Sequence, residues 1–204
     1  MNILFIVSII GIIVIFPIYY LSLEHNRLEN KFGKEKGRKI GNILGMISGW
    51  GFYIFWMGIW FSPQPRFTIP LLNIFFIIPF FDFILPLIHI IISIPFIVLA
   101  IYLGIKGVID TSLKTAETHR PEKVVTTGLY NYLRHPQYLG GLLAHIGISF
   151  IMSALYSILS TPFIIIYIYL LAWKEEKELV KEFPEEYLDY KKKVPMFIPK
   201  FWKK

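Results

Sequence analysis

The chain has 204 residues, of which 55% are hydrophobic and only 17% charged, and its mean hydropathy is +0.56. A soluble domain of this length needs more polar surface to cover its core, so the composition argues against a soluble protein and predicts an integral membrane protein. The net charge of +7 falls mainly in predicted loops, which argues against nucleic acid as a partner. Because the chain has no cysteine, disulfides, a thiol nucleophile and a thiolate metal site are excluded, and we expect no metal.

Five apolar segments are expected to cross the membrane, because about 20 residues at 1.5 Å per residue span the hydrocarbon core. The first lacks a basic leader and a cleavage site, so we interpret it as a retained helix rather than a signal peptide. The last two are joined so tightly that they should form an antiparallel hairpin. The predicted spans are 2–23, 41–61, 86–107, 137–155 and 156–173.

Two features of the first half need separate interpretation. The polar, basic stretch 24–40 is expected to be a loop. After it, Gly41, Gly45 and Gly49 recur every four residues, which places small residues on one helix face. This spacing favours close packing of another helix over a phosphate-binding loop, since no strand precedes it.

The apolar segment 67–85 is not expected to be a straight span. Prolines occur within it and close to both its ends, and proline removes backbone donors and kinks helices. We expect this segment to re-enter the membrane or to lie in the outer interface. Asp82 within it, and His89 and His145 in the following spans, are polar groups that are costly in hydrocarbon and therefore functional candidates.

Lysine and arginine predict the orientation. Of the 21 such residues, six lie in 24–40, five in 106–135 and nine in 174–204, whereas only Arg66 lies in the other loops. By the positive-inside rule, the basic segments are cytoplasmic and the N-terminus is outside. The expected fold is therefore an all-α integral membrane protein with five transmembrane helices, one re-entrant or interfacial segment and a cytoplasmic helical tail. We expect one domain over 1–204, with N-terminal spans in 1–110 and a cofactor-binding hairpin and tail in 111–204.

Two polar clusters should meet on the cytoplasmic side. The stretch 126–140 enters the fourth predicted span, and the acidic pair Glu175 and Glu176 leaves the fifth. Because these spans form a hairpin, Arg134 and His135 should face the acidic pair. Pro136 suits the first turn of a helix, whose free N–H groups favour an anion. The alternative is that these residues only anchor the hairpin at the interface.

These clusters resemble a known family. Gly128-Leu129-Tyr130 followed by Arg134-His135-Pro136-Gln137-Tyr138 is similar to the signature of isoprenylcysteine carboxyl methyltransferases and phospholipid methyltransferases, which are membrane enzymes. After 36 intervening residues, Glu175-Glu176 and a tail from Phe183 to Pro199 continue the likeness. The resemblance covers about residues 121–199.

The resemblance implies methyl transfer from S-adenosyl-L-methionine to a lipophilic acceptor in the membrane, either a prenylcysteine-like carboxylate or a lipid amine. It places cofactor binding at Lys123, Val124, Val125, Tyr130, His135, Pro136, Gln137, Tyr138 and Glu175. Arg134 is the candidate catalytic residue: it either steers an anionic acceptor or pairs with Glu176. His145 either lines an acceptor channel or forms an interhelical hydrogen bond.

One departure bears on the acceptor. Carboxyl methyltransferases of this group carry an arginine about one turn before the acidic pair, whereas this chain has Leu171-Ala172-Trp173 there. This difference weakens the hypothesis that the methyl acceptor is a carboxylate. Two other functions stay open: an NADPH-dependent reductase of the sterol-reductase type, which has a similar arginine–histidine–proline element, and a non-enzymatic membrane scaffold or small transporter.

Overall fold

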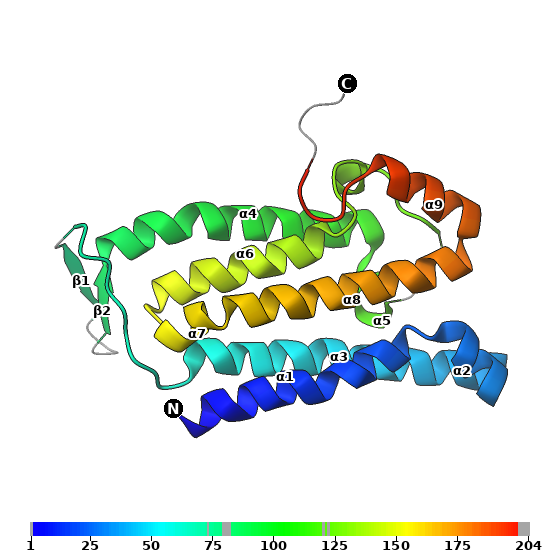
Figure 1. Ribbon diagram of the computed structural model, residues 1–204, viewed down its shortest axis with the longest axis horizontal. Coiled ribbons are helices and arrows are strands. Elements are labelled where there is room, and N and C mark those ends of the chain that lie inside the picture. Colours follow the sequence, from blue (N-terminus) through cyan, green and yellow to red (C-terminus); the bar gives the residue numbers. More distant parts are fainter. Residues whose placement is uncertain (1, 73, 79–82, 120, 122, 200–204) are drawn as a thin grey trace.

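The computed structural model describes residues 2–72, 74–78, 83–119, 121 and 123–199 (Figure 1). Almost all of its regular structure is helical, as the sequence predicts. In chain order the elements are α1 (Ile3–Ser22), α2 (His25–Phe32), α3 (Lys34–Phe61), β1 (Phe75–Ile78), β2 (Phe83–Pro86), α4 (Leu87–Thr111), α5 (Leu113–Thr118), the 3-10 helix η1 (Gly128–Asn131), α6 (Pro136–Ile151), α7 (Leu155–Leu159), α8 (Thr161–Glu182) and α9 (Pro184–Lys193).

Three of the described helices, α1, α3 and α4, are long and apolar enough to cross a membrane by length and composition. A membrane helix needs about 20 residues, and α6 has 16. Helix α8 has 22 residues, but its last third is charged. The structure thus supports an integral membrane protein, and the five-span prediction is not confirmed.

The long helices form a bundle in which α1 lies beside α3, α4 lies beside α6, and α8 runs between the two pairs (Figure 1). The chain reverses direction between α6 and α8, so the predicted antiparallel hairpin is confirmed. Its turn is longer than expected, because the helix ends at Ile151 and the short helix α7 follows. Buried apolar side chains of α1, α3 and α8, including Ile12, Ile59 and Ile164, fill the space between the helices.

Glycines allow α1 and α3 to approach closely. A Cβ atom at Gly58 would overlap the hydroxyl of Ser8, and one at Gly51 would press into Ile15. The glycines of the predicted stripe pack against elements other than α1. Gly41 lies against α2, and a Cβ at Gly45 would lie 3.1 Å from the carbonyl oxygen of Thr118 at the end of α5. Small residues therefore permit helix packing at these positions, as the spacing predicted.

The prediction that 24–40 is a loop was wrong. Helix α2 and the first turns of α3 occupy this stretch. Its residues are good helix formers, and hydropathy marks where a helix leaves the hydrocarbon rather than where the helix ends. Helix α2 buries His25 and Leu28 and exposes Arg27 and Lys31.

The described part of 67–85 contains no spanning helix. Instead β1 and β2 pair in antiparallel register, with Phe75 opposite Pro86 and Phe76 opposite Leu85. This two-stranded sheet corrects the all-α prediction, and aromatic and β-branched residues explain it, since they favour strands. Phe75, Phe76, Ile77 and Ile84 are each about half exposed or more. Asp82 lies outside the described residues.

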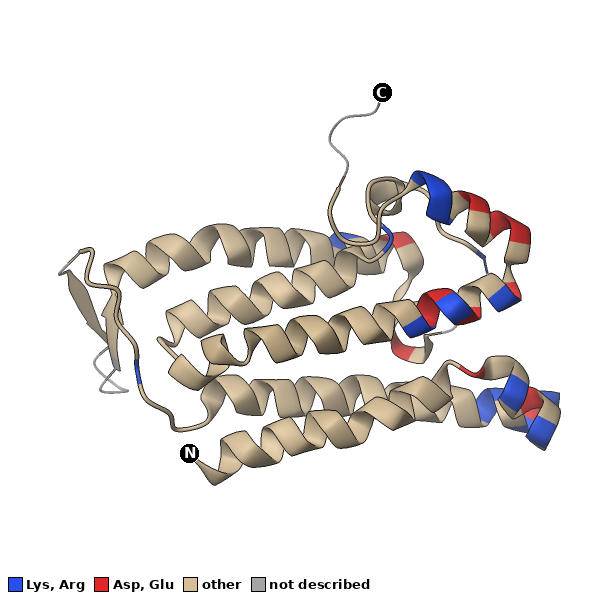
Figure 2. Ribbon diagram, viewed as in Figure 1, with Lys and Arg blue, Asp and Glu red and all other residues tan. Residues whose placement is uncertain are grey.

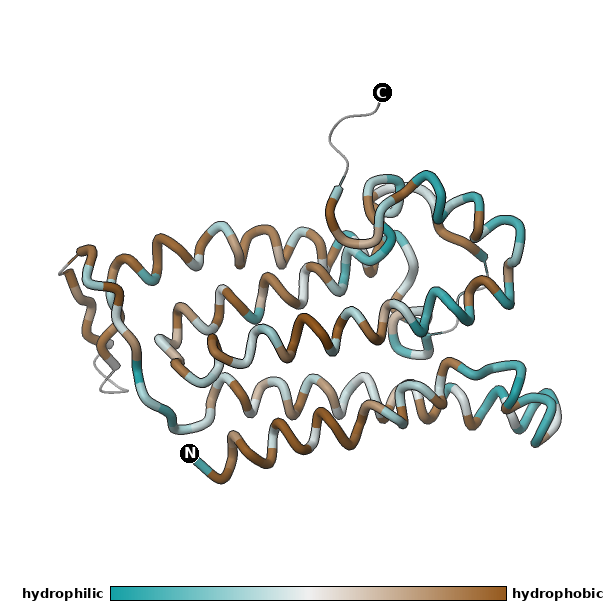
Figure 3. The backbone as a smooth tube through the Cα atoms, viewed as in Figure 1, coloured by the Kyte–Doolittle hydropathy of each residue, from teal (hydrophilic) through white to brown (hydrophobic). Residues whose placement is uncertain are grey.

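Charge separates the two ends of the bundle. Lysine, arginine and acidic residues gather where α2, the end of α8 and α9 lie, whereas the end with the N-terminus and the β-hairpin carries little charge (Figure 2). Apolar residues dominate the length of the helices between these ends (Figure 3). Many large apolar side chains on this surface are exposed, among them Val14, Ile54 and Val98. Such a surface suits contact with lipid.

The two buried histidines of the apolar region serve packing. His145 Nδ1 accepts hydrogen bonds from the indole N–H groups of Trp56 and Trp60, at 2.9 and 3.0 Å, and its Nε2 lies 3.1 Å from the carbonyl oxygen of Ser157. His145 does not line the pocket described below, so of its two predicted roles the interhelical hydrogen bond is the one observed. His89 Nδ1 lies 2.9 Å from the hydroxyl of Ser153.

Candidate functional site

The site begins at a turn that only glycine adopts easily. Gly128 has a φ of +61°, and a Cβ atom there would overlap the carboxylate of Asp110. That carboxylate accepts a hydrogen bond of 2.9 Å from the backbone N–H of Leu129. The contact fixes η1 against the end of α4 and thereby positions Tyr130.

Tyr130 is held at both ends. Its backbone carbonyl accepts a hydrogen bond of 2.6 Å from the hydroxyl of Tyr190 on α9. Its own hydroxyl accepts one of 3.1 Å from the side-chain amide of Gln137, which also donates to Thr111 at 3.1 Å. Burial raises the pKa of Tyr130, so its phenol stays protonated. Three parts of the chain thus converge on one tyrosine.

The fold brings together the two predicted polar clusters. Arg134 Nε donates to Glu176 Oε1 at 2.6 Å, and His135 Nε2 lies 3.2 Å from the same oxygen. Lys191 of α9 reaches Glu176 Oε2 at 2.8 Å. Burial alone would raise the pKa of Glu176, but hydrogen bonds from His135, Arg134 and Lys191 outweigh it and lower the pKa to about 2. Glu176 is only 1% exposed, so this is a buried, fully paired carboxylate.

Of the two roles predicted for Arg134, its contacts match pairing with Glu176 rather than steering of an acceptor. Besides Glu176, its guanidinium donates to the carbonyl oxygens of Lys191 and Val194. Its backbone N–H donates to Pro195 at 2.9 Å, and that of His135 donates to Met196 at 3.1 Å. Arg134 therefore fastens the tail after α9 over the start of α6.

Glu175 lies on the other side of this cluster and enters a network of hydroxyl groups. Tyr138 donates to Glu175 Oε2 at 2.9 Å, and its hydroxyl also hydrogen-bonds to that of Tyr19 on α1. His135 Nδ1 lies 3.8 Å from Glu175 Oε2, and the His135 ring stacks on that of Tyr138 with centroids 5.3 Å apart. The side chain of Glu175 is 23% exposed, so it is partly open to a ligand.

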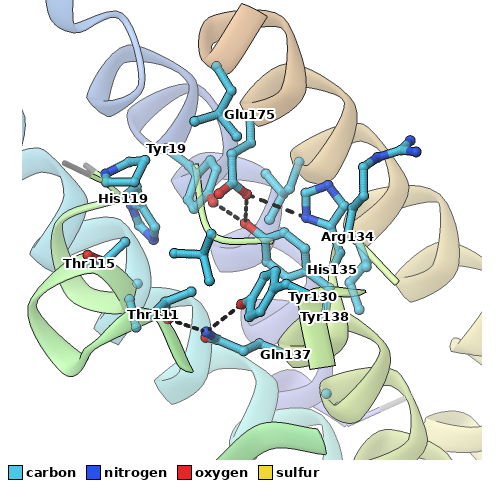
Figure 4. Close-up of a pocket in the computed structure, with 18 of the residues that line it drawn as sticks. Tyr19, Thr111, Thr115, His119, Tyr130, Arg134, His135, Gln137, Tyr138 and Glu175 are labelled. Atoms are coloured by element: carbon cyan, nitrogen blue, oxygen red, sulfur yellow. Dashed lines mark hydrogen bonds and ion pairs between the residues drawn. The ribbon is translucent and has the colours of Figure 1, made fainter. Parts of the chain in front are cut away.

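These side chains face a pocket between the bundle and α9 (Figure 4). Nine of the ten predicted site residues line it: Lys123, Val124, Val125, Tyr130, Arg134, His135, Gln137, Tyr138 and Glu175. The tenth, Pro136, starts α6 as predicted and packs against Gly107.

Helix α9 closes one side of the pocket. Pro184 starts this helix, which forms part of the predicted helical tail, and Tyr187 and Tyr190 lie on its buried face. Val124 packs with both tyrosines and with Val194 in a small apolar cluster. Burial raises the pKa of Tyr187, which therefore stays neutral against the ligand space. Among the described residues, no group of three or more histidine or acidic side chains gathers to hold a metal ion.

Sequence reasoning missed the lining residues that lie before residue 121. Tyr19 of α1, several side chains of α3 and His119 after α5 also line the pocket. On α3, Ser48, Phe52 and Trp56 recur every four residues, so they share one helix face. That spacing is visible in the sequence. The glycines on the same helix were interpreted as helix-packing positions, although Gly49 also lines the pocket.

Comparison with known proteins now bears on this arrangement. A profile of the phospholipid methyltransferase family matches residues 81–186, which include both polar clusters. The chain belongs to this family. Helices α1 and α3 precede the matched region.

Related proteins carry several methyltransferase names. The chain is 34% identical over 84 residues to protein-S-isoprenylcysteine O-methyltransferase of Xenopus laevis, covering 37% of this chain and 27% of that protein. It is 37% identical over 84 residues to the Saccharomyces cerevisiae protein of the same name, covering 37% and 32%. It is 35% identical over 88 residues to methanethiol S-methyltransferase of Crocosphaera subtropica, covering 42% and 33%. The match thus spans about a third or less of these relatives. No solved structure matches the chain.

Proposed function

We propose that this protein is an S-adenosyl-L-methionine-dependent methyltransferase that acts on a lipophilic acceptor reached from the membrane. The observation that carries the proposal is the convergence of the 128–138 stretch and Glu175 on one pocket in a member of this family. Names among the relatives support three acceptor classes: a prenylcysteine carboxylate, a phospholipid and a thiol.

The residues of the pocket fit this methyl donor. Glu175 offers a carboxylate on a partly exposed side chain for ribose hydroxyls or an ammonium group. Val124 and Val125 offer an apolar wall beside the tyrosines of α9 for a base. His135 and the first turn of α6 offer hydrogen-bond donors for a carboxylate. The cofactor supplies a methyl group on a positively charged sulfur.

The chain's own residues then contribute positioning and electrostatics. A tyrosine face near the sulfonium, from Tyr130 or Tyr138, gains about 0.5–2 kcal/mol as a cation–π contact. Transfer requires an acceptor lone pair aligned with the methyl carbon, so the main contribution of the protein is orientation. Arg134 is a positioning residue in this proposal: it holds Glu176 and the tail after α9 in place, and it acts on the site through them.

We also propose that 1–204 works as one domain, since α1 and α3 line the same pocket as the family region. The orientation predicted from basic residues, with a cytoplasmic site and the N-terminus outside, agrees with the gathering of charge at one end. The two ends of 67–85 then lie on the same, outer side.

Cofactor binding tests the proposed function directly. We expect S-adenosylhomocysteine to raise the melting temperature of the purified protein in detergent and NADPH to leave it unchanged. Stabilisation by NADPH alone, with its oxidation on addition of a sterol, would favour the reductase alternative. If neither ligand changes the melting temperature, the result favours the hypothesis of a non-enzymatic scaffold or small transporter. Transfer of labelled methyl into a crude lipid extract then identifies the acceptor.

The orientation is testable by single cysteines, because the chain has none of its own. We expect cysteines at Asn2, Leu71 and Ile84 to react with a membrane-impermeant maleimide in intact cells. Those at Lys36 and Lys192 should react only after permeabilisation. Reaction of positions 71 and 84 from opposite sides would contradict the prediction that 67–85 does not cross the membrane.

A further inference from the structure

The last turn of α1 brings Tyr19 to the pocket. Its side chain is 4% exposed and belongs to the apolar core between α1, α3 and α8. Its ring lies against the ring of His119, with centroids 4.4 Å apart. A tyrosine in such surroundings needs a partner for its hydroxyl, because an unpaired buried hydroxyl is costly.

The partner is Tyr138 on α6. The hydroxyl groups of Tyr19 and Tyr138 are hydrogen-bonded to each other, and the hydroxyl of Tyr138 donates to Glu175 Oε2 at 2.9 Å (Figure 4). A tyrosine hydroxyl carries one hydrogen, and a carboxylate can only accept. Because Tyr138 gives its hydrogen to Glu175, Tyr19 is the donor in the contact between the two tyrosines. Donation therefore runs from Tyr19 through Tyr138 to Glu175.

Two ion contacts fasten the end of α1 to α8 near this hydroxyl network. Lys174 Nζ, on the residue before Glu175, lies 3.2 Å from Glu24 Oε1. His25 Nδ1 lies 2.5 Å from Glu182 Oε1. Both partners on the N-terminal side come within three residues of the end of α1. These contacts hold α1 against the charged part of α8, so the last turn of α1 stays within reach of the site.

The carboxylate of Glu175 depends on such a hydroxyl for its direction. It has no lysine or arginine partner among the described residues, and its nearest cation-forming group is His135, whose Nδ1 lies 3.8 Å from Oε2. Tyr138 and Glu175 lie inside the region matched by the family, whereas Tyr19 lies outside it. The family match therefore accounts for the carboxylate and its first hydroxyl partner, but not for the second donor behind them.

We propose that Tyr19 is a positioning residue of the cofactor site: its hydroxyl holds that of Tyr138, which in turn orients the Glu175 carboxylate for ligand binding. The inference rests on the proposed methyl-transfer function. It makes α1 a working part of the cofactor site, although α1 precedes the region matched by the family. Tyr19 acts through Tyr138, so its contribution requires the Tyr138 hydroxyl.

The test is a double-mutant cycle on S-adenosylhomocysteine affinity, measured by equilibrium dialysis with full-length proteins in detergent. It compares the wild type with Tyr19→Phe, Tyr138→Phe and the double variant. Tyr167→Phe is the matched control. Tyr167 is also 4% exposed, its buried hydroxyl has no hydrogen-bond partner among the described residues, and it does not line the pocket.

We expect Tyr19→Phe to weaken binding about three- to tenfold, the effect of losing one hydrogen bond between neutral groups. In the Tyr138→Phe background the same change should weaken binding by less than about 1.5-fold, because the hydroxyl that Tyr19 holds is already absent. Tyr167→Phe should leave the affinity within about 1.5-fold of the wild type. If Tyr19→Phe does not fold, Tyr19→Met, which also lacks a hydroxyl, replaces it in both backgrounds.

Two results would overturn the inference. One is unchanged affinity in the Tyr19 variant, and the other is an equal loss in both backgrounds, which would place the effect in packing or in direct contact with the ligand. In either case the proposed function survives, because the wild type binds S-adenosylhomocysteine. Failure of the wild type to bind would instead reject the proposed function, and the inference with it.

Discussion

Replacement of Glu175 by glutamine should weaken S-adenosylhomocysteine binding roughly 10- to 150-fold, since a hydrogen bond to a charged group contributes about 1.5–3 kcal/mol. The reason is local: the side chain of Glu175 is partly exposed, accepts from Tyr138 at 2.9 Å and has no lysine or arginine partner within the described chain. Glu175→Ala should lose measurable binding. Equilibrium dialysis with labelled ligand measures both.

A matched control lies one turn further along the same helix. Glu178 is also a largely buried glutamate, but it pairs with Lys174 and Lys181 and does not line the pocket. Glu178→Gln should lower the melting temperature and leave ligand affinity within about twofold. His135→Ala should lose binding as Glu175→Ala does. Normal binding in both alanine variants would end the assignment of the cofactor site.

The meeting of the two polar clusters could be predicted from sequence because it follows from local rules. A helix that begins at Pro136 and an antiparallel helix that runs through Glu176 must bring their charged ends together. The contacts of Arg134 and His135 with Glu176 confirm this.

The contribution of α1 and α3 could not be predicted in this way. Helices that are apolar on every side carry little information about which face meets which neighbour, because lipid and protein interior are equally apolar. Tyr19 therefore gave no local signal. The β-hairpin was missed for a related reason: a short apolar run such as Phe75 to Ile78 fits a buried helix or a strand equally well by periodicity.

Replacement of Glu176 by alanine should be the most destabilising single change at the site. Removing one partner of a buried ion pair costs about 3–5 kcal/mol, because the other charge is left without compensation. Here Arg134 is 9% exposed and would lose its carboxylate. We expect a melting temperature lower by roughly 6–20 °C in detergent. Glu186→Ala, at an exposed position of α9, should change it by less than about 2 °C.

The pH dependence of stability provides an independent test of Glu176. The pKa of Glu176 is about 2 in the folded protein against an ordinary value of 4.5. A carboxylate with a depressed pKa stabilises the fold above its unfolded value and loses that contribution as pH falls toward the folded value. The stability difference between wild type and Glu176→Gln should therefore be constant above about pH 5 and shrink between pH 4.5 and 2. A difference that persists unchanged at pH 2 would contradict the buried-carboxylate assignment.

The same pair separates the two roles considered for Arg134. Arg134→Met alone should destabilise the protein, because it leaves Glu176 with His135 and Lys191 only. The double variant Arg134→Met with Glu176→Leu should recover part of that loss, since a buried ion pair can often be replaced by apolar side chains of similar volume. If Arg134 acts only by holding Glu176 and the tail, the double variant should also recover S-adenosylhomocysteine binding and methyl transfer together. Recovery of folding and binding without methyl transfer would instead show that the guanidinium itself meets the acceptor.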